Sequence, residues 1–438
     1  MSTGSIRARC RTVLQAIATA GLMLASATTA QASDLSGDAA TEAPAGASDW
    51  TTRETLSGDW DGSRRSLEQR GIVIKPRLTQ FVQAMTAGDG PHGGEYGGKA
   101  DLLVAADLGK LGLWSGLSMT VHAEANFGNS VNGRGGVAIP VNTALEFPGI
   151  DGADAYDFSS VFFTQRFGDS ASVVFGKINM IDMAQTRDFM GGAGIDAFWN
   201  LTFTAPPSGT VPPYLFGVLA RFQTEAATYH LWVYDPVSVA NKSVFDDPFG
   251  SGVNIRATVD IPVTLGGLPG HQGFTALYST QDGTDLASLD GILLPSPVPG
   301  AVQIKDSRYY VAWIFDQQLY RAPGSATEGF GLFGQLGVSD GNPNGLRWSL
   351  LAGIGGKGLI PGRSQDNWGI GYYYDSFSQA LKDALAPVQT LRNEQGVELF
   401  YNFALTPWCV LGLDLQVIRP ALASATAVFP GMRAVIRF

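Results

Sequence analysis

The sequence has 438 residues, of which 45% are hydrophobic, 11% aromatic and only 16% charged, and its formal net charge is −10. This length suits two or three soluble domains or one large barrel, and so little charge beside 55 glycines is unusual for a soluble protein. The acidic balance argues against nucleic acid as a partner. The absence of a run of about 18 apolar residues after the N-terminus argues against a helical membrane protein.

Residues 1–32 have the pattern of a secretory signal peptide. Three arginines precede an apolar segment over 13–27, and Ala30-Gln31-Ala32 supplies the small residues of a cleavage site. We expect the exported chain to begin at Ser33. Cys10 leaves with the signal peptide, so Cys409 is then the only cysteine and no intramolecular disulfide can form.

The next two segments precede the main body of the chain. Residues 33–48 are rich in Ala, Gly, Asp, Thr and Ser, and we predict a disordered leader over 33–55. In the segment 56–71, Asp61 or Ser63 can cap a short helix and Gly71 can end it. We place this helix at the periplasmic mouth of a pore, just before the first strand.

From residue 72 to residue 438, apolar and polar residues alternate with period two in runs of about ten, the length of a tilted membrane-spanning strand. The pattern predicts an all-β fold, a transmembrane antiparallel β-barrel of about sixteen strands. The expected strands are 72–82, 99–108, 117–127, 156–167, 171–178, 215–223, 227–234, 252–261, 272–280, 307–319, 328–338, 347–356, 367–375, 396–405, 409–418 and 431–438. The fourth, fifth and twelfth alternate poorly, so their bounds are the least defined.

The connections between these strands fall into two classes. Those after even-numbered strands are short, such as 168–170 and 224–226, whereas those after odd-numbered strands are usually longer, such as 127–155 and 179–214. Short turns on one side and long extracellular loops on the other are typical of an outer-membrane barrel, and a soluble sandwich has no reason to sort its loops in this way.

The final strand is expected to close the barrel. Met432, Ala434, Ile436 and Phe438 lie on one face of it, and two arginines lie on the other face. Pairing with the first strand removes the exposed edge that such a strand would otherwise present. The basic residues of both strands then meet across the seam, so acidic groups or water must lie among them.

Alternation also predicts which side chains line the barrel wall. A charge that faces lipid costs about 2 to 4 kcal/mol at the bilayer midplane, so charged residues of the strands are assigned to the lumen. Such residues line a solute path, or they form ion pairs along the wall of a wide lumen. The candidates are Lys75, Arg77, His122, Glu124, Asn126, Arg256, Asp260, Arg308, Asp316, Arg433 and Arg437.

The two longest loops, after the third and fifth strands, are candidates for the constriction of the pore. Both combine charged, amide and aromatic residues with glycines that permit sharp turns. Alternatively, they only cover the outer mouth. The candidate residues are Asn132, Arg134, Asn142 and Glu146 in the first loop, and Arg187, Asp188, Asp196, Phe198 and Trp199 in the second.

Four stretches of the sequence resemble the OprB-type carbohydrate-selective porins. They are LSGDWDG at 56–62, YGGKADLLVAADLGKLGLWSGLSMTVHAEANFGNSVN at 96–132, IPVNTALEFP at 139–148 and ALTPWCVLGLDLQVIRPA at 404–421. The resemblance implies a sixteen-stranded outer-membrane pore that passes monosaccharides and related small sugars, narrowed by extracellular loops folded inward. Asp61 stands where the family more often has glycine, so the chain departs from the family pattern at the periplasmic mouth.

Other functions were weighed against a sugar porin. An enzyme is disfavoured because the sequence has only four histidines and no G-x-S-x-G motif. His122 and Glu124 have a spacing found in metal sites, but on a strand they only mark two positions on the lumen face. We therefore predict no cofactor and no metal. A general or anion-selective porin is the closer alternative, and an adhesin or structural barrel would conduct nothing.

The expected location is the outer membrane of a Gram-negative bacterium. The expected partners are small sugars, outer-membrane lipids and lipopolysaccharide, and the barrel assembly machinery, which would recognise the closing strand that ends at Phe438. The residues do not distinguish a monomer from a homotrimer.

Overall fold

The computed structural model describes residues 49–150, 155–183, 189–208, 210–289, 302–325 and 327–438. The expected signal peptide and most of the expected leader lie outside these residues. No helix among the described residues is long and apolar enough to cross a membrane.

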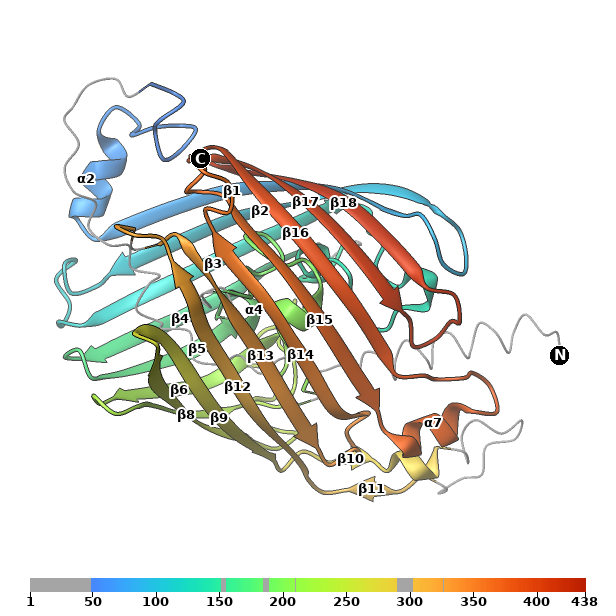
Figure 1. Ribbon diagram of the computed structural model, residues 1–438. Helices are drawn as coiled ribbons and strands as arrows, with labels where there is room; N and C mark the ends of the chain where they lie inside the picture. The colour runs from blue at the N-terminus through green and yellow to red at the C-terminus, as the bar shows by residue number, and fades with distance from the viewer. Residues whose placement is uncertain (1–48, 151–154, 184–188, 209, 290–301, 326) are drawn as a thin grey trace.

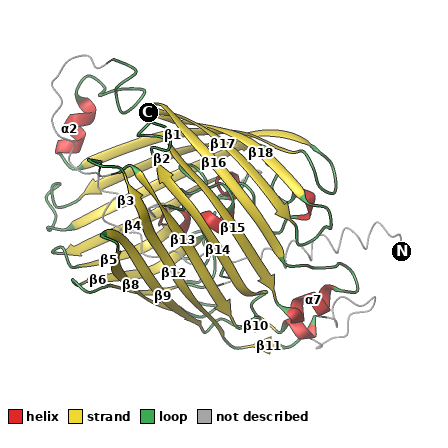
Figure 2. Ribbon diagram, viewed as in Figure 1, coloured by secondary structure: helices red, strands yellow, loops and turns green. Residues whose placement is uncertain are grey.

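The described residues form a closed barrel of antiparallel strands, drawn in Figures 1 and 2. Around the barrel the order is β1-β18-β17-β16-β15-β14-β13-β12-β9-β8-β7-β6-β5-β4-β3-β2, which confirms the sixteen-stranded prediction. The bounds are β1 Ile72–Met85, β2 Gly93–Asp107, β3 Leu117–Gly128, β4 Tyr156–Phe167, β5 Ala171–Asn179, β6 Tyr214–Gln223, β7 Thr228–Tyr234, β8 Asn254–Leu265, β9 Leu268–Ser279, β12 Arg308–Arg321, β13 Gly329–Ser339, β14 Leu346–Lys357, β15 Asn367–Phe377, β16 Glu394–Thr406, β17 Cys409–Arg419 and β18 Ala427–Arg437.

The strands differ from the prediction mainly at their ends. β2 begins at Gly93 rather than at residue 99, because Gly93, Gly94, Gly97 and Gly98 pair with β1 without contributing to the hydropathy pattern. β8 and β9 extend to a turn at Gly266 and Gly267, and both glycines have a positive φ, which a tight two-residue hairpin requires. The poorly alternating fourth, fifth and twelfth strands lie close to their expected bounds.

Smaller elements occupy the connections. They are α2 Ser63–Gln69, η1 Arg134–Gly136, α3 Thr143–Glu146, α4 Met180–Met183, α5 Leu201–Thr204, η4 Leu286–Ser288, α7 Gln379–Leu385 and a separate pair of short strands, β10 Gly283–Thr284 and β11 Ile304–Lys305. Figure 1 shows α2 and the C-terminus at one end of the barrel and α7 at the other. The long connections 129–155 and 180–213 start from the end opposite the C-terminus, as the alternation of loop lengths predicts.

The final strand closes the barrel against the first. In the register of this seam Leu78 is opposite Ile436 and Arg77 is opposite Arg437, so the apolar residues share one face and the basic residues share the other. Outward positions along the wall are apolar and exposed, for example Val82 and Met432. Since a lipid-facing surface must be apolar, this alternation fits a membrane-spanning wall.

The segment before β1 is attached to the closed seam. The backbone N–H of Leu56 donates to the Arg437 carbonyl over 2.8 Å, and Arg64 Nη2 donates to the Phe438 carbonyl over 2.8 Å. Gly62, rather than Asp61 or Ser63, is the N-cap of α2, and Asp59 Oδ1 accepts the N–H of Arg65. The contacts with Arg437 and Phe438 involve the C-terminal end of the last strand and the residue after it. They therefore form only when the barrel has closed.

Arg64→Met is therefore expected to destabilise the closed barrel by up to about 1 kcal/mol, because a partly exposed charged hydrogen bond is lost. The measurement is the temperature at which the folded barrel converts to the slower-migrating unfolded band in detergent gels. Arg65→Met on the same helix is the matched control, since Arg65 only forms an exposed ion pair with Asp59. Equal transition temperatures for the two variants would contradict the role given to Arg64.

Candidate functional site

Two connections fold into the barrel, and carboxylates of one strand hold them there. Glu394 on β16 accepts the backbone N–H groups of Ala138 and Ile139 over 2.7 and 3.0 Å. Four residues further along the same inner face, Glu398 accepts those of Trp199 and Asn200 over 2.5 and 3.0 Å. Both carboxylates are buried. Each glutamate therefore fixes one inward loop, the first between β3 and β4 and the second between β5 and β6.

The second loop also packs aromatic rings into positions where the wall has glycine. A Cβ added at Gly371 of β15 would lie 2.4 Å from the Phe203 ring, and one at Gly431 of β18 would lie 2.7 Å from the Trp199 ring. The Phe198 ring lies 4.6 Å from that of Phe203. All three rings are buried. The absence of side chains along this part of the wall thus provides the space for the loop.

Trp199, one of the predicted constriction residues, is buried in this packing. Its ring meets Phe81 of β1 edge-on at 5.2 Å, and the Arg433 guanidinium lies 5.1 Å from its centre. Arg433 also donates to the Gly194 and Ala197 carbonyls over 3.0 and 3.1 Å. Trp199 and Arg433 therefore position the loop, and neither presents its side chain to open space.

Charged residues of the seam meet an acidic residue of the same loop. Asp196 accepts from Arg77 at 3.3 Å and from Arg437 at 2.7 Å, so one carboxylate lies between the two guanidinium groups that face each other across the seam. Arg77 also pairs with Asp101 at 3.0 Å. Of the two expected ways to separate the basic residues, acidic groups or water, the structure has acidic groups, Asp101 and Asp196. About a third of the Asp196 and Arg437 side chains is exposed, so this cluster borders the open interior.

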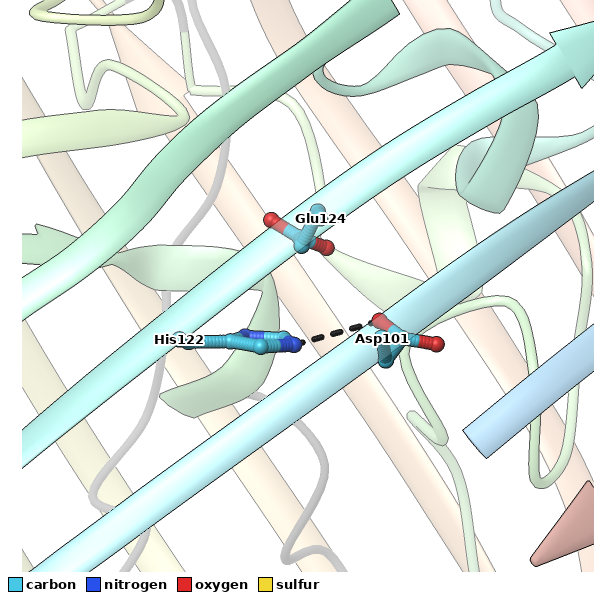
Figure 3. A group of neighbouring side chains, drawn as sticks. All are labelled: Asp101, His122 and Glu124. Carbon is cyan, nitrogen blue, oxygen red and sulfur yellow. Dashed lines mark hydrogen bonds and ion pairs between the residues drawn. The ribbon is translucent and has the colours of Figure 1, made fainter. Parts of the chain in front are cut away.

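A chain of ion pairs continues onto β2 and β3, as Figure 3 shows for Asp101, His122 and Glu124. His122 lies between Asp101 at 3.1 Å and Asp182 of α4 at 2.6 Å, and Lys99 pairs with Glu124. The donor atoms of Asp101, His122 and Glu124 lie within 4.8 Å of one another, a spacing that suits a metal ion. However, every polar atom of these three side chains already has a protein partner, since Asn179 and Tyr214 donate to the second oxygen of Glu124. The cluster is therefore organised as ion pairs that attach α4 to the wall.

The predicted residues of the first loop hold that loop together. Asn132 donates to the Asn142 carbonyl and to Glu146 Oε2, each over 2.9 Å, and Asn142 caps α3. Burial raises the pKa of the Glu146 carboxyl, and the hydrogen bond from Asn132 opposes part of that rise. Arg134 pairs with Glu95 of β2. Arg187 and Asp188, predicted for the second loop, lie outside the described residues.

The remaining wall candidates lie on the inner face but differ in exposure. Asn126 is buried and donates to the Ala144 and Phe147 carbonyls of the first loop, whereas Lys75 is exposed and Asp260 is half-buried. Arg256 is buried on β8. Sequence reasoning missed Glu394 and Glu398. Alternation could have identified Glu398, because it is an inward position of the expected strand 396–405.

Comparisons with known proteins agree with this architecture. The model of the carbohydrate-selective porin family OprB matches residues 91–438. A curated relative, the putative porin QuiX of Acinetobacter baylyi, is 25% identical over 418 residues, which covers 84% of this chain and 88% of the relative. Of the four stretches that resemble the family, only 56–62 lies outside the matched residues.

Solved structures show the same fold. The high-pH structure of Pseudomonas putida OprB covers 89% of this chain and 99% of its own, with a TM-score of 0.76 and 19% identity. The low-pH structure of the same protein covers the same shares, with a TM-score of 0.54 and 17% identity.

Proposed function

The chain belongs to the OprB family of carbohydrate-selective porins, and we propose that it passes monosaccharides and related small sugars through the outer membrane by passive diffusion. The solute path runs through the part of the interior that the two inward loops leave open, past the partly exposed Asp196 and Arg437. Conduction through a porin requires binding that is strong enough to select a solute and weak enough to release it.

The observation that carries this proposal is the balanced charge cluster at the seam. Arg77 and Arg437 contribute two positive charges, and Asp101 and Asp196 contribute two negative charges, within direct ion-pair distances. Sugar hydroxyls both donate and accept hydrogen bonds, so alternating guanidinium and carboxylate groups suit them. A balanced cluster exerts little net field on ions, which favours a neutral solute over the alternative of a general anion-selective porin.

Planar-bilayer recording with the purified protein tests the proposal. We expect glucose to reduce the ion current and the pore to show little anion preference, and we expect glucose to enter protein-containing liposomes in a swelling assay. Strong anion selectivity without any block by glucose would contradict the sugar-porin assignment. A protein that is folded but conducts no current would instead favour an adhesin or structural barrel.

Asp196→Asn is expected to weaken the block by glucose and to shift the selectivity of the pore towards anions. The change removes the negative charge between Arg77 and Arg437 and leaves those two positive charges uncompensated on the loop side. The measurement is the reversal potential in a salt gradient. Asp246→Asn, in an exposed connection outside the barrel strands, has the same charge change and serves as the control. A reversal potential shifted equally in both variants would contradict a pore-lining role for Asp196.

A further inference from the structure

On the wall far from the seam, one buried guanidinium forms no ion pair with any residue that the structure describes. Arg256 of β8 is 2% exposed, and its Nε donates to Thr275 Oγ1 over 2.9 Å. Its Nη1 and Nη2 have no hydrogen-bond partner among the described residues. The ionisable groups that interact with it are the hydroxyls of Tyr234 and Tyr310, neither of which is acidic at neutral pH.

Such an arrangement is costly unless something compensates it. A buried charge without a partner is strongly destabilising, whereas ion pairs elsewhere in the barrel match cations with carboxylates. Arg256 and Arg221 both lie close enough to His230 to act on it electrostatically, whereas no effect of Arg221 on Arg256 itself is resolved. The missing partner of Arg256 is therefore an anion at its own Nη1 and Nη2 atoms.

The geometry of Arg256 defines which anion fits. The Trp232 ring covers one face of the guanidinium at 4.6 Å, and Thr275 occupies its Nε edge. The remaining edge carries the Nη1 and Nη2 donors, which form a planar fork that matches the two oxygens of a carboxylate. A spherical ion would use only part of that fork.

Neighbouring polar groups extend the site beyond the carboxylate. Asn254 lies opposite Tyr234 in the register of β7 and β8, and a weak side-chain hydrogen bond links the two. The Asn254 Nδ2 donates to the Thr210 carbonyl of the second inward loop over 2.8 Å. The site therefore lies beside the second inward loop, and the Asn254 amide and the Tyr234 hydroxyl can exchange their mutual hydrogen bond for hydrogen bonds to a ligand that carries hydroxyl groups.

We propose that Arg256, with Trp232, Tyr234 and Asn254, forms a subsite for the carboxylate of a small solute. The inference rests on the proposed function, because it assigns a substrate class to the same lumen. The carboxylate comes either from a simple short-chain acid or from a carboxylated sugar, and the hydroxyl-binding groups beside Arg256 distinguish the two sources.

The test compares the wild-type protein with Arg256→Met. Methionine is of similar length and uncharged, and replacing a buried, unpaired charge by an apolar side chain is neutral or stabilising, so the variant should fold. Arg221→Met removes the same charge from the inner face of β6, where Arg221 already bonds to Gln223, and is the matched control. Acetate and gluconate are the probes, and their binding is measured by calorimetry in detergent and by current block in bilayers.

We expect gluconate to bind at least about tenfold more weakly to Arg256→Met than to the wild type, because a bidentate charged hydrogen bond is lost, and to bind Arg221→Met almost unchanged. Equal losses for acetate and gluconate would support a site for any carboxylate, and a loss confined to gluconate would support a carboxylated sugar. Unchanged affinity of Arg256→Met for both probes, or no binding of either by the wild type, would overturn the proposal. Block by glucose reports separately on the sugar-porin function, since it does not require a carboxylate.

Discussion

Replacement of Gly371 by valine is expected to raise the single-channel conductance several-fold and to abolish block by glucose. The Cβ of residue 371 would lie 2.4 Å from the Phe203 ring, and that ring is fixed among buried aromatic neighbours, 6.4 Å from Phe333 and 5.9 Å from Tyr373. Overpacking of this kind costs about 1 to 3 kcal/mol. The wall is held by its continuous strand ladder, whereas side-chain contacts attach the loop to the wall, so the loop should yield.

The matched control is Gly273→Val on β9. This glycine also lies in a strand of the barrel, but a Cβ there would meet no atom closer than 3.6 Å. Conductance and glucose block should therefore stay near those of the wild type. The folded state of both variants is checked by circular dichroism and by heat-dependent migration in detergent gels. A folded Gly371→Val pore with unchanged conductance would show that the second loop does not narrow the path.

Glu398→Ala is expected to enlarge the pore by a different route. The carboxylate accepts two buried backbone N–H groups, from Trp199 and Asn200, and each unsatisfied group costs about 1 to 3 kcal/mol. The loop can recover these hydrogen bonds only by moving towards water. We therefore expect a higher conductance, larger current fluctuations and weaker block by glucose.

Glu398→Gln separates the hydrogen bonds from the charge. Glutamine keeps one acceptor oxygen in a side chain of the same shape, so its conductance should lie between those of the wild type and Glu398→Ala. Asp414 on the neighbouring strand is linked to Glu398 by a side-chain hydrogen bond, and the amide also changes that link. A wild-type conductance in Glu398→Ala would rule out the anchoring role of this carboxylate. An effect of equal size in Glu398→Gln would assign the anchoring to charge rather than to the accepted hydrogen bonds.

The wall of the barrel could be predicted because its signal is local. Along β3, Met119, Val121 and Ala123 alternate with polar residues, and membrane crossing requires one apolar face at every strand. The same rule placed His122, Glu124 and Arg433 on the inner face. It failed where glycines replace side chains, as at the start of β2, because a glycine contributes nothing to either face.

The inward loops could not be predicted in the same way. Their fold depends on contacts with residues far away in the sequence, such as the hydrogen bond between Trp199 and Glu398, which are 199 positions apart. The aromatic and charged residues of the loops made them candidates for the constriction of the pore. This composition could not distinguish the buried Trp199 from the partly exposed Asp196. Only the position of each residue against the wall decides which of them borders the solute path.

A sixteen-stranded membrane barrel closed by its last strand can be predicted from the amino-acid pattern, because the lipid imposes the same period-two requirement on every strand and leaves no edge unpaired. The same pattern required acidic groups or water between the arginines that meet across the seam. Only the folded chain shows that Asp196 is the acidic group there, that Glu394 and Glu398 hold the two loops, and that Arg256 Nη1 and Nη2 have no partner within the described residues. These outcomes depend on hydrogen bonds and ion pairs between residues that are far apart in the sequence. A local sequence pattern does not predict such contacts.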